Sequence, residues 1–353
     1  MTKPHKSIDY KTAGVDTEKA QNLIQNLKKE IVSTHKNLNT GNVRKNFGGF
    51  AGLFQPHKKF NGFDLVAATD GVGTKIELCR QFNYFEELGY DLVGMCVNDL
   101  YCLGASPFFF LDYISCGKLD ESWYSPLLKS ITKACKSASL ALLGGETAEH
   151  PGLMKKDEFD LAGFCVGAVD PKKALPKLDE IKEGDLIAGF ASSGPHSNGF
   201  SLIRKILKKL KKENPAEYNS LMSDKNFIEK KLLIGTRIYS FIPEMISKVR
   251  VKAIAHITGG GFYENIPRIL PETMAAYIEK PGIFNHDIFN LIERFVKPAD
   301  MYKTFNMGIG IIAIIDKRDS ELIKQFDKRS SIIGIIKKRR KDEKNVFIQG
   351  IDT

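Results

Sequence analysis

The 353-residue chain lacks the features of several protein classes. It contains no apolar run near the roughly 20 residues that a helix needs to cross a bilayer. Residues 1–16 are polar and lack the apolar segment of a secretory signal. We therefore expect no membrane association and a cytoplasmic location. The content of 42% hydrophobic and 27% charged residues is typical of a soluble globular protein.

Sequence patterns for disulfides and for common metal sites are also missing. The six cysteines, at positions 79, 96, 102, 116, 135 and 165, form no C-x-x-C pair, and several lie in apolar runs. This pattern favours buried free thiols over disulfides or a cysteine metal site. The seven histidines show no H-E-x-x-H spacing. No window fits G-x-x-x-x-G-K-[S/T], which excludes a Walker phosphate loop.

The net charge of +10 raises the question of nucleic acid binding. Much of the excess lies in two clusters, Lys205/Lys208/Lys209/Lys211/Lys212 and Lys337/Lys338/Arg339/Arg340/Lys341. The first lies opposite an apolar stripe that includes Ile203 and Leu207, as on the solvated face of an amphipathic helix. No basic ribbon interleaved with aromatic residues is present. We expect no nucleic acid partner, and anionic small-molecule substrates suit the charge better.

Strands and helices alternate in both halves of the chain. We predict strands at 64–69, 108–115, 140–144, 161–169, 186–191, 252–257 and 308–315, and helices at 17–37, 76–82, 89–103, 121–139, 199–212 and 262–269. A polar, proline-punctuated stretch at 170–182 is typical of a linker. These patterns indicate α/β or α+β layers in two domains, residues 1–170 and 171–353.

The most informative segment runs from Ala68 to Lys75, with sequence ATDGVGTK. It joins a predicted strand to a predicted helix. Gly71 and Gly73 let the backbone approach a phosphate, Thr74 opens the helix, Lys75 supplies positive charge, and Asp70 is an oxygen ligand suited to magnesium. We predict that these residues bind the phosphates of a nucleotide and its metal ion. A tight turn that merely enters a helix remains the alternative.

Two further acidic residues are candidates for the same metal site. Asp99 falls on the helix stripe of Leu92, Cys96 and Leu103, so we expect it to be buried and to need a cation or a strong donor. A magnesium ligand is favoured over a structural salt bridge. Glu146, in the Gly144-Gly145-Glu146 segment after a predicted strand, is the candidate third carboxylate.

Two glycine-rich loops in the second half are candidate phosphate sites. In the first loop, Gly194 and the helix-capping residues Ser197 and Asn198 precede a helix, where free N–H groups suit an anion. His196 within it could donate to a phosphate or move a proton, although loop histidines are more often structural. In the second, Gly259 and Gly260 begin a triple glycine that can form a nest of backbone donors. His256, in the preceding strand, has packing as its default interpretation.

Taken together, these segments resemble the phosphoribosylformylglycinamidine cyclo-ligase family, whose members are also called aminoimidazole ribonucleotide synthetases. The resemblance covers nearly the whole chain in order and spacing. It includes the segments at 10–16, 48–50, 68–75, 95–100, 109–113, 144–149, 162–167, 193–199, 258–262 and 302–310. Residues 316–353 carry no motif of the family, and Tyr101-Cys102 departs from its pattern.

The resemblance implies closure of the imidazole ring of formylglycinamidine ribonucleotide at the expense of ATP, in purine biosynthesis. Asp70, Asp99 and Glu146 would hold Mg²⁺, and Lys75 would neutralise phosphoryl oxygens. His196 would contact the phosphoryl group or transfer a proton. The family fold has two α+β domains, with homodimerisation through the sheet of the N-terminal domain.

Other functions remain open at this point. The same superfamily includes selenophosphate synthetase, thiamine-monophosphate kinase and a hydrogenase-maturation protein. Selenophosphate synthetase has a reactive cysteine or selenocysteine in an N-terminal glycine-rich loop, and residues 48–54 here contain none. A non-catalytic nucleotide-binding protein would rarely need three carboxylates and a lysine.

Overall fold

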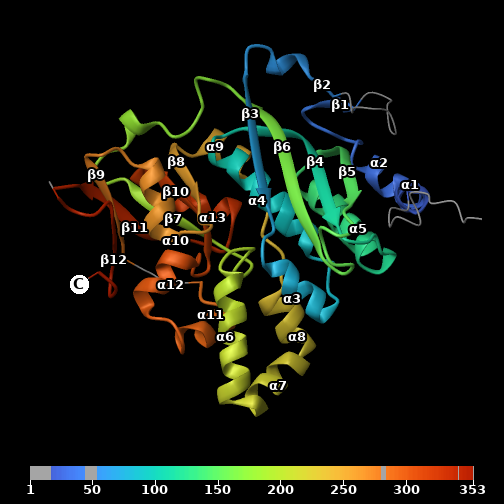
Figure 1. Ribbon diagram of the computed structural model, residues 1–353. Helices are drawn as coiled ribbons and strands as arrows, with labels where there is room; N and C mark the ends of the chain where they lie inside the picture. The colour runs from blue at the N-terminus through green and yellow to red at the C-terminus, as the bar shows by residue number, and fades with distance from the viewer. Residues whose placement is uncertain (1–16, 44–53, 280–283, 341, 353) are drawn as a thin grey trace, which may run out of the picture.

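The structure of the chain is a computed structural model that describes residues 17–43, 54–279, 284–340 and 342–352. These residues form a four-stranded sheet, a six-stranded sheet and a small ribbon of two strands (Figure 1). Helices pack on the two larger sheets. The α+β fold with two domains is thereby confirmed. None of the helices in the described ranges is long and apolar enough to cross a membrane.

The four-stranded sheet and its helices come from the first half of the chain. The elements are α1 (Thr17–Asn26), α2 (Lys28–Ser33), β1 (Gly41–Val43), β2 (Phe54–Pro56), a 3₁₀ turn (Lys58–Phe60), β3 (Asp64–Gly71), α3 (Lys75–Phe82), α4 (Leu88–Cys102), β4 (Ser106–Cys116), α5 (Glu121–Ser137), β5 (Ala141–Glu149) and β6 (Phe159–Val169).

The six-stranded sheet comes from the second half. Its first elements are a 3₁₀ turn (Leu178–Glu180), β7 (Leu186–Ala191), α6 (Phe200–Glu213), α7 (Pro215–Ser223), α8 (Lys225–Phe227), a π-helical turn (Ile228–Leu232), α9 (Ile242–Lys248), β8 (Val251–His256) and α10 (Gly261–Asn265). A 3₁₀ turn (Ile266–Ile269), β9 (Met274–Ile278), α11 (Asp287–Glu293), α12 (Pro298–Thr304), β10 (Ile309–Ile315), a 3₁₀ turn (Lys317–Leu322), α13 (Ile323–Phe326), β11 (Ser330–Lys338) and β12 (Val346–Ile348) follow.

The register of the four-stranded sheet fixes which side chains share a face. The strand order is β3-β6-β4-β5, with only β4 and β5 parallel among these pairs. Asp70 pairs with Gly163, Gly163 pairs with Asp112, and Asp112 pairs with Gly145. Because paired residues point to the same side and side chains alternate, Asp70 and Asp112 lie on the face that α4 covers.

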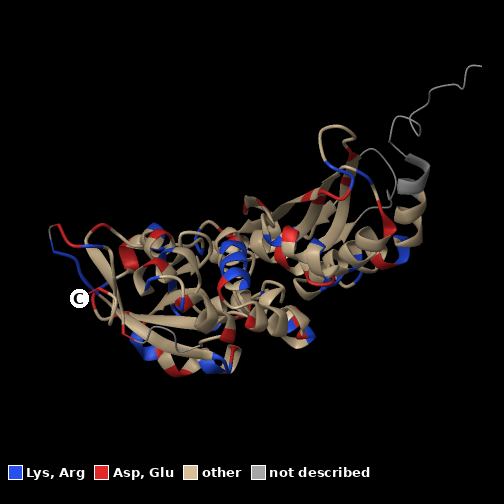
Figure 2. Cartoon of the chain, turned by 60° about the horizontal axis from the view of Figure 1, so that its bottom comes forward, with Lys and Arg blue, Asp and Glu red and all other residues tan. Residues whose placement is uncertain are grey.

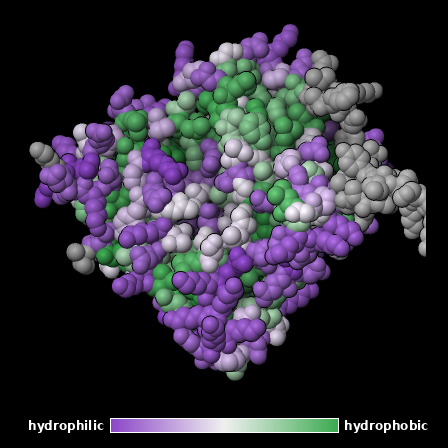
Figure 3. Space-filling view, viewed as in Figure 1, coloured by the Kyte–Doolittle hydropathy of each residue, from purple (hydrophilic) through white to green (hydrophobic). Residues whose placement is uncertain are grey.

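The opposite face of this sheet carries exposed apolar side chains. Leu65 on β3 is 76% exposed, Tyr113 on β4 is 43% exposed and Phe164 on β6 is 41% exposed. Figure 3 shows hydrophobic residues gathered over these strands. Exposed apolar patches of this kind are typical of interaction surfaces.

The six-stranded sheet has the order β12-β9-β11-β7-β10-β8 and forms the core of the second domain. Every residue of the inner strand β10 is buried, and so is every residue of β8, the edge strand that α4 contacts. Helix α6 confirms the predicted amphipathic pattern, since Ile203 and Leu207 are buried while the lysine cluster is exposed. Figure 2 shows the other charges of both signs interspersed over the two domains.

An extended segment, residues 234–239, returns from the second domain to lie along α4. Three side chains hold it by hydrogen bonds, those of Asp91 and Asn98 in α4 and that of Glu87, the residue just before α4. Glu87 accepts from the Gly235 N–H at 3.1 Å, and Asn98 accepts from the Tyr239 N–H at 3.1 Å and donates to the Arg237 carbonyl at 2.9 Å. Asp91 bonds Thr236 between them. This segment therefore fixes α4 to the second domain.

Several predicted elements differ from the structure. The helix predicted at 17–37 is two helices, α1 and α2. The strand predicted at 140–144 continues to Glu149, because β5 pairs with β4 along its length. The helix predicted at 262–269 is the short α10 followed by a 3₁₀ turn. The glycine-rich loop at 48–52 lies outside the described residues. All six cysteines are free thiols, and five are buried, as predicted.

Candidate functional site

The segment Asp70 to Lys75 leads from the end of β3 into α3. Asp70 and Gly71 are the last residues of the strand, and the Asp70 carboxylate accepts the Gly71 N–H at 2.7 Å. Gly73 has φ +70° and open space where a Cβ would stand. Thr74 precedes the helix, and its hydroxyl lies 2.9 Å from that of Ser201 on α6. The turn is therefore open to a ligand and touches the second domain.

Asp70 and Asp99 meet at the junction between the domains. Burial raises the pKa of Asp70, the Gly71 N–H opposes this, and the charge of Asp99 adds to the rise. Asp99 accepts a hydrogen bond from Nδ1 of His256 at 2.9 Å. Its side chain is 48% exposed, so the predicted burial of Asp99 is wrong. The carboxylate turns outward from α4, and its second oxygen remains available.

The two glycine-rich loops of the second domain lie side by side at this junction. A Cβ on Gly259 would stand 3.4 Å from the side-chain oxygen of Asn198. Asn198 also contacts Met95 of α4, with 3.8 Å between its nitrogen and the sulfur. Gly260 has φ +87°, and Asn265 donates to the carbonyls of Thr258, Gly259 and Gly261. The amide side chain of Asn265 thus fixes the backbone of the second loop.

His196 is completely buried in the first loop, with its backbone at φ +61°. Burial holds the pKa of His196 well below its usual value, and the neighbouring His256 and Lys75 lower it further. The imidazole is therefore neutral near pH 7. Nε2 accepts the Ser193 N–H at 3.4 Å, which assigns the proton to Nδ1. Within the described residues this Nδ1 has no hydrogen-bond partner.

Lys75 does not face the opening of the site. Its side chain is fully buried, with Nζ 2.6 Å from the Asp91 carboxylate. It also donates to the carbonyl of Ile234 at 2.7 Å and to that of His196 at 3.0 Å. Two carbonyl acceptors and one paired carboxylate thus surround the ammonium group. The prediction that Lys75 neutralises phosphoryl oxygens directly does not fit this geometry.

Glu146, Gly144 and Gly145 do not join the other candidates within one chain. They lie on β5, three strands from Asp70 on β3, which is about 14 Å at the usual strand spacing. Glu146 pairs with Tyr113 on the exposed face, opposite to Asp70. A Cβ on Gly145 would stand 2.3 Å from the Asp112 carboxylate, so packing explains this glycine. In the described residues, no group of three or more His, Cys, Asp or Glu side chains could hold a metal ion.

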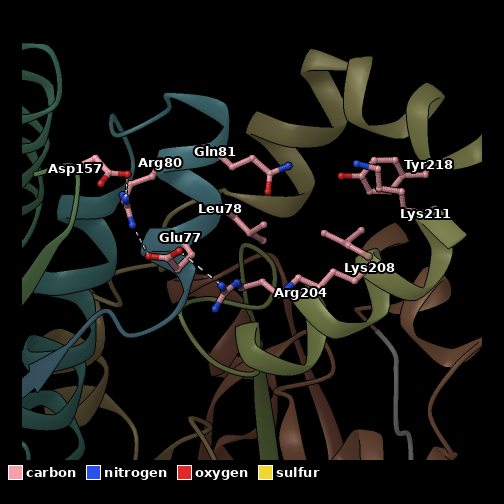
Figure 4. A pocket seen from close by; sticks show the side chains of 10 residues that line it. Glu77, Leu78, Arg80, Gln81, Asp157, Arg204, Lys208, Lys211 and Tyr218 are labelled. Atoms are coloured by element: carbon pink, nitrogen blue, oxygen red, sulfur yellow. Dashed lines mark hydrogen bonds and ion pairs between the residues drawn. The ribbon is translucent and has the colours of Figure 1, made fainter. Parts of the chain in front are cut away.

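A charged groove of about 510 Å³ runs along α3 and α6 from the junction (Figure 4). Glu77 lies 2.7 Å from Arg80 and 3.6 Å from Arg204, so it bridges the two helices. Lys208 and Lys211 line the groove further along α6. Its lining carries more positive than negative side chains, which favours anionic molecules near the site.

Three residues at the junction were not predicted as part of the site. Asp91 binds Lys75, Asn98 lies 3.5 Å from the His256 ring, and His256 holds Asp99. Asp91 and Asn98 are buried polar residues in a largely apolar helix, which is the signal that could have revealed them. For His256 the signal was its position just before the triple glycine.

Comparisons with known proteins give the same fold and a family. The family models of the N-terminal and C-terminal domains of AIR synthase related proteins match residues 51–169 and 182–346. A phosphoribosylformylglycinamidine cyclo-ligase of Leptospira interrogans serovar copenhageni is 46% identical over 328 residues, covering 92% of this chain and 93% of the relative. That of Caldicellulosiruptor saccharolyticus is 42% identical, covering 93% and 97%.

Two solved structures are similar in fold at low sequence identity. Hydrogenase maturation protein HypE in complex with ATP has a TM-score of 0.65 at 17% identity, covering 95% of this chain and 92% of that structure. Thiamine-monophosphate kinase from Stenotrophomonas maltophilia K279a has a TM-score of 0.62 at 16% identity, covering 93% and 96%. The matched domains and the high identity over most of its length show that this chain belongs to the phosphoribosylformylglycinamidine cyclo-ligase family of AIR synthase related proteins.

Proposed function

We propose that this enzyme converts formylglycinamidine ribonucleotide to aminoimidazole ribonucleotide, with ATP converted to ADP and phosphate. The observation that carries the proposal is the convergence of Asp70, Asp99 and the loops of His196 and Gly259 at one junction, in a chain 46% identical to a named cyclo-ligase. The formamide oxygen would accept the γ-phosphoryl group. An amidine nitrogen would then attack the same carbon, and phosphate would leave.

Asp70 and Asp99 are our proposed ligands for Mg²⁺. The pair fits this ion, because magnesium in nucleotide sites is usually held by one or two carboxylates together with phosphates and water. The ion would supply positive charge against the phosphates of ATP. His256 donates to one oxygen of Asp99 and orients the other toward the junction.

The backbone of three segments would seat the phosphates. The candidates are Gly71, Gly73 and Thr74 after β3, Gly194, Ser197 and Asn198 before α6, and Gly259 and Gly260 before α10. In each segment a glycine-containing turn leads to the start of a helix, where N–H groups are unpaired and suit an anion. The neutral His196, with its proton on Nδ1, is suited to donate a hydrogen bond to the substrate, whereas proton transfer by this ring would first require that it take up a proton.

We further propose a homodimer in the cytoplasm, formed through the exposed face of the four-stranded sheet. Leu65, Tyr113 and Phe164 supply apolar area there, and helices cover the opposite face. Glu146 and Gly144 on β5 share this exposed face, whereas Gly145 between them faces Asp112 on the other side. In the proposed dimer, residues 144–146 could contact a metal-bound nucleotide only if the second copy of the chain held that nucleotide. We keep 1–170 and 171–353 as the proposed domains.

The activity is tested by incubating the purified protein with formylglycinamidine ribonucleotide, ATP and magnesium chloride. We expect ADP and aminoimidazole ribonucleotide to appear in equal amounts, and neither to appear without the ribonucleotide. ATP binding without formation of the aminoimidazole product would contradict the proposed reaction. It would direct attention to the kinase and synthetase activities of the superfamily.

A further inference from the structure

The ammonium group of Lys75 is surrounded by protein acceptors. Asp91 lies 2.6 Å away, and both side chains have no exposed area. The other two acceptors are backbone carbonyls, those of Ile234 and His196. The ring of Phe200 lies 5.3 Å from Nζ and excludes water on another side. Lys75 is thus a buried cation that is completely satisfied without a ligand.

Asp91 connects Lys75 to the segment 234–239, which crosses between the domains. One of its oxygens faces Lys75, and the other accepts the N–H of Thr236 at 3.0 Å and its hydroxyl at 2.7 Å. Removing either partner of a buried pair leaves an uncompensated charge in a medium of low polarity. The position of Lys75 therefore depends on Asp91, although Asp91 has no contact with the surface.

The bond from Lys75 to His196 acts on the backbone of the first glycine-rich loop. His196 is a non-glycine residue at φ +61°, a conformation that such residues rarely adopt unless their surroundings hold it. Its carbonyl points inward to Lys75. Because a trans peptide is planar, the N–H of Ser197 in the same unit points the opposite way. Among the described residues, no hydrogen bond uses this N–H.

We propose that Lys75 and Asp91 are a positioning pair, which holds the peptide between His196 and Ser197 so that the imidazole and the Ser197 N–H are fixed for the substrate. Lys75 then acts through the loop and does not touch the transferred phosphoryl group. This inference rests on the proposed cyclo-ligase function. It assigns a role to Asp91, a residue that cannot reach any ligand.

The test compares Lys75→Met, Asp91→Asn and the double variant with a matched buried pair. Lys252 and Asp185 form that control, with oxygens 2.7 and 2.8 Å from Nζ and both residues buried, in the second domain and away from the His196 loop. Two quantities are measured, kcat and the ¹⁵N–¹H signal of the His196 ring. Replacement of His196 by Asn assigns that signal, which needs no turnover and therefore stays informative if the proposed reaction fails.

We expect both single variants to shift the His196 signal and to lower kcat by about tenfold or more, with a smaller change in KM for ATP. The double variant carries no unpaired charge. It should therefore recover part of the lost kcat and part of the shift in the His196 signal. Lys252→Met and Asp185→Asn should leave the His196 signal in place, even where they lower stability. If Lys75→Met does not fold, Asp91→Asn and the double variant decide the question.

Two results would overturn the positioning role. The first is loss of turnover in Lys75→Met with an unchanged His196 signal, which would mean that Lys75 acts on the ligand directly. The second is an Asp91→Asn protein with normal kcat and a normal His196 signal. Absence of product from the wild-type protein would instead count against the proposed function alone.

Discussion

Among single residues, Asp99 offers a direct test of the metal site, because its half-exposed carboxylate can be neutralised without disturbing a core. We expect Asp99→Asn to fold normally and to lose about 100-fold in ATP-dependent turnover, since the amide keeps the acceptor for His256 but loses the charge that we propose holds magnesium. Steady-state kinetics over a range of magnesium concentrations, together with thermal unfolding, provide the measurement.

Asp64 is a suitable control for this experiment. It is an exposed aspartate at the opposite end of β3, far from the junction. Asp64→Asn should retain wild-type turnover. A folded Asp99→Asn protein with normal activity at low magnesium would remove Asp99 from the metal site.

Asp112 gives a second prediction, for stability against pH. Burial raises its pKa to about 7, and the charge of Glu146 adds to the rise. The folded protein therefore binds this proton more tightly than the unfolded chain, whose aspartates titrate near pH 4. The resulting loss in the free energy of unfolding is absent below about pH 4, grows as the pH rises, and is complete above about pH 7.

Asp112→Asn removes the ionisation and should make the protein more stable at pH 8, by about 1–3 kcal/mol. The gain should shrink steadily toward pH 4. Urea unfolding of both proteins at several pH values measures the difference. A gain that is equal at pH 5 and pH 8 would show that the charge of Asp112 is not its cause.

At the scale of elements, strand β5 contains two adjacent glycines with different surroundings. A Cβ on Gly145 would stand 2.3 Å from the Asp112 carboxylate, whereas one on Gly144 would meet Leu111 at 3.7 Å, an ordinary contact. We expect Gly145→Ala to cost about 1–3 kcal/mol of unfolding free energy and Gly144→Ala to be nearly neutral. Urea unfolding of the two variants measures this, and an equal cost would contradict the packing explanation.

The elements also show what the sequence can and cannot predict about the site. The turn after β3 and the two loops before α6 and α10 could be predicted, because glycines and polar residues mark turns at the ends of strands. The segment from Gly144 to Glu146 carries the same signal but lies inside a strand. Whether a Gly-Gly-Glu segment is a loop depends on its pairing with β4, which is a long-range contact.

The surroundings of Lys75 and Asp99 could not be predicted for a related reason. Helical periodicity places Asp99 with apolar residues, but its side chain is 48% exposed and bonds His256, 157 residues later in the chain. A lysine after glycines suggests a phosphate contact, but Lys75 forms an ion pair with the buried Asp91. The partners of charged groups are set by tertiary contacts that local patterns do not contain.

At the scale of the whole molecule, the exposed apolar face of the first domain leads to a prediction about assembly. We expect the wild-type protein to sediment as a dimer and Phe164→Asp to sediment as a monomer, because a charge in an apolar interface would be desolvated. Leu178, 40% exposed in the second domain, is the control, and Leu178→Asp should stay dimeric. Analytical ultracentrifugation distinguishes these results, and a monomeric wild-type protein would contradict the dimer.

Most of the long strands and the α+β fold of two domains could be predicted, because each of these strands is an apolar run bounded by turn residues. The strands at β9 and β12 and the helices from α7 to α9 were missed. They are short elements of three to nine residues, whose structure depends on packing against the rest of the second domain.

The crossing segment at 234–239 has a consequence for how the protein is made. Its hydrogen bonds reach back across 148 residues to Glu87, 145 to Asp91 and 141 to Asn98. During synthesis α4 and its sheet leave the ribosome long before this segment does. The helix can therefore fold first, and the segment can bind to it later. A second domain released alone would leave these backbone groups to water, and its loop at 192–199 would lose its contact with α4.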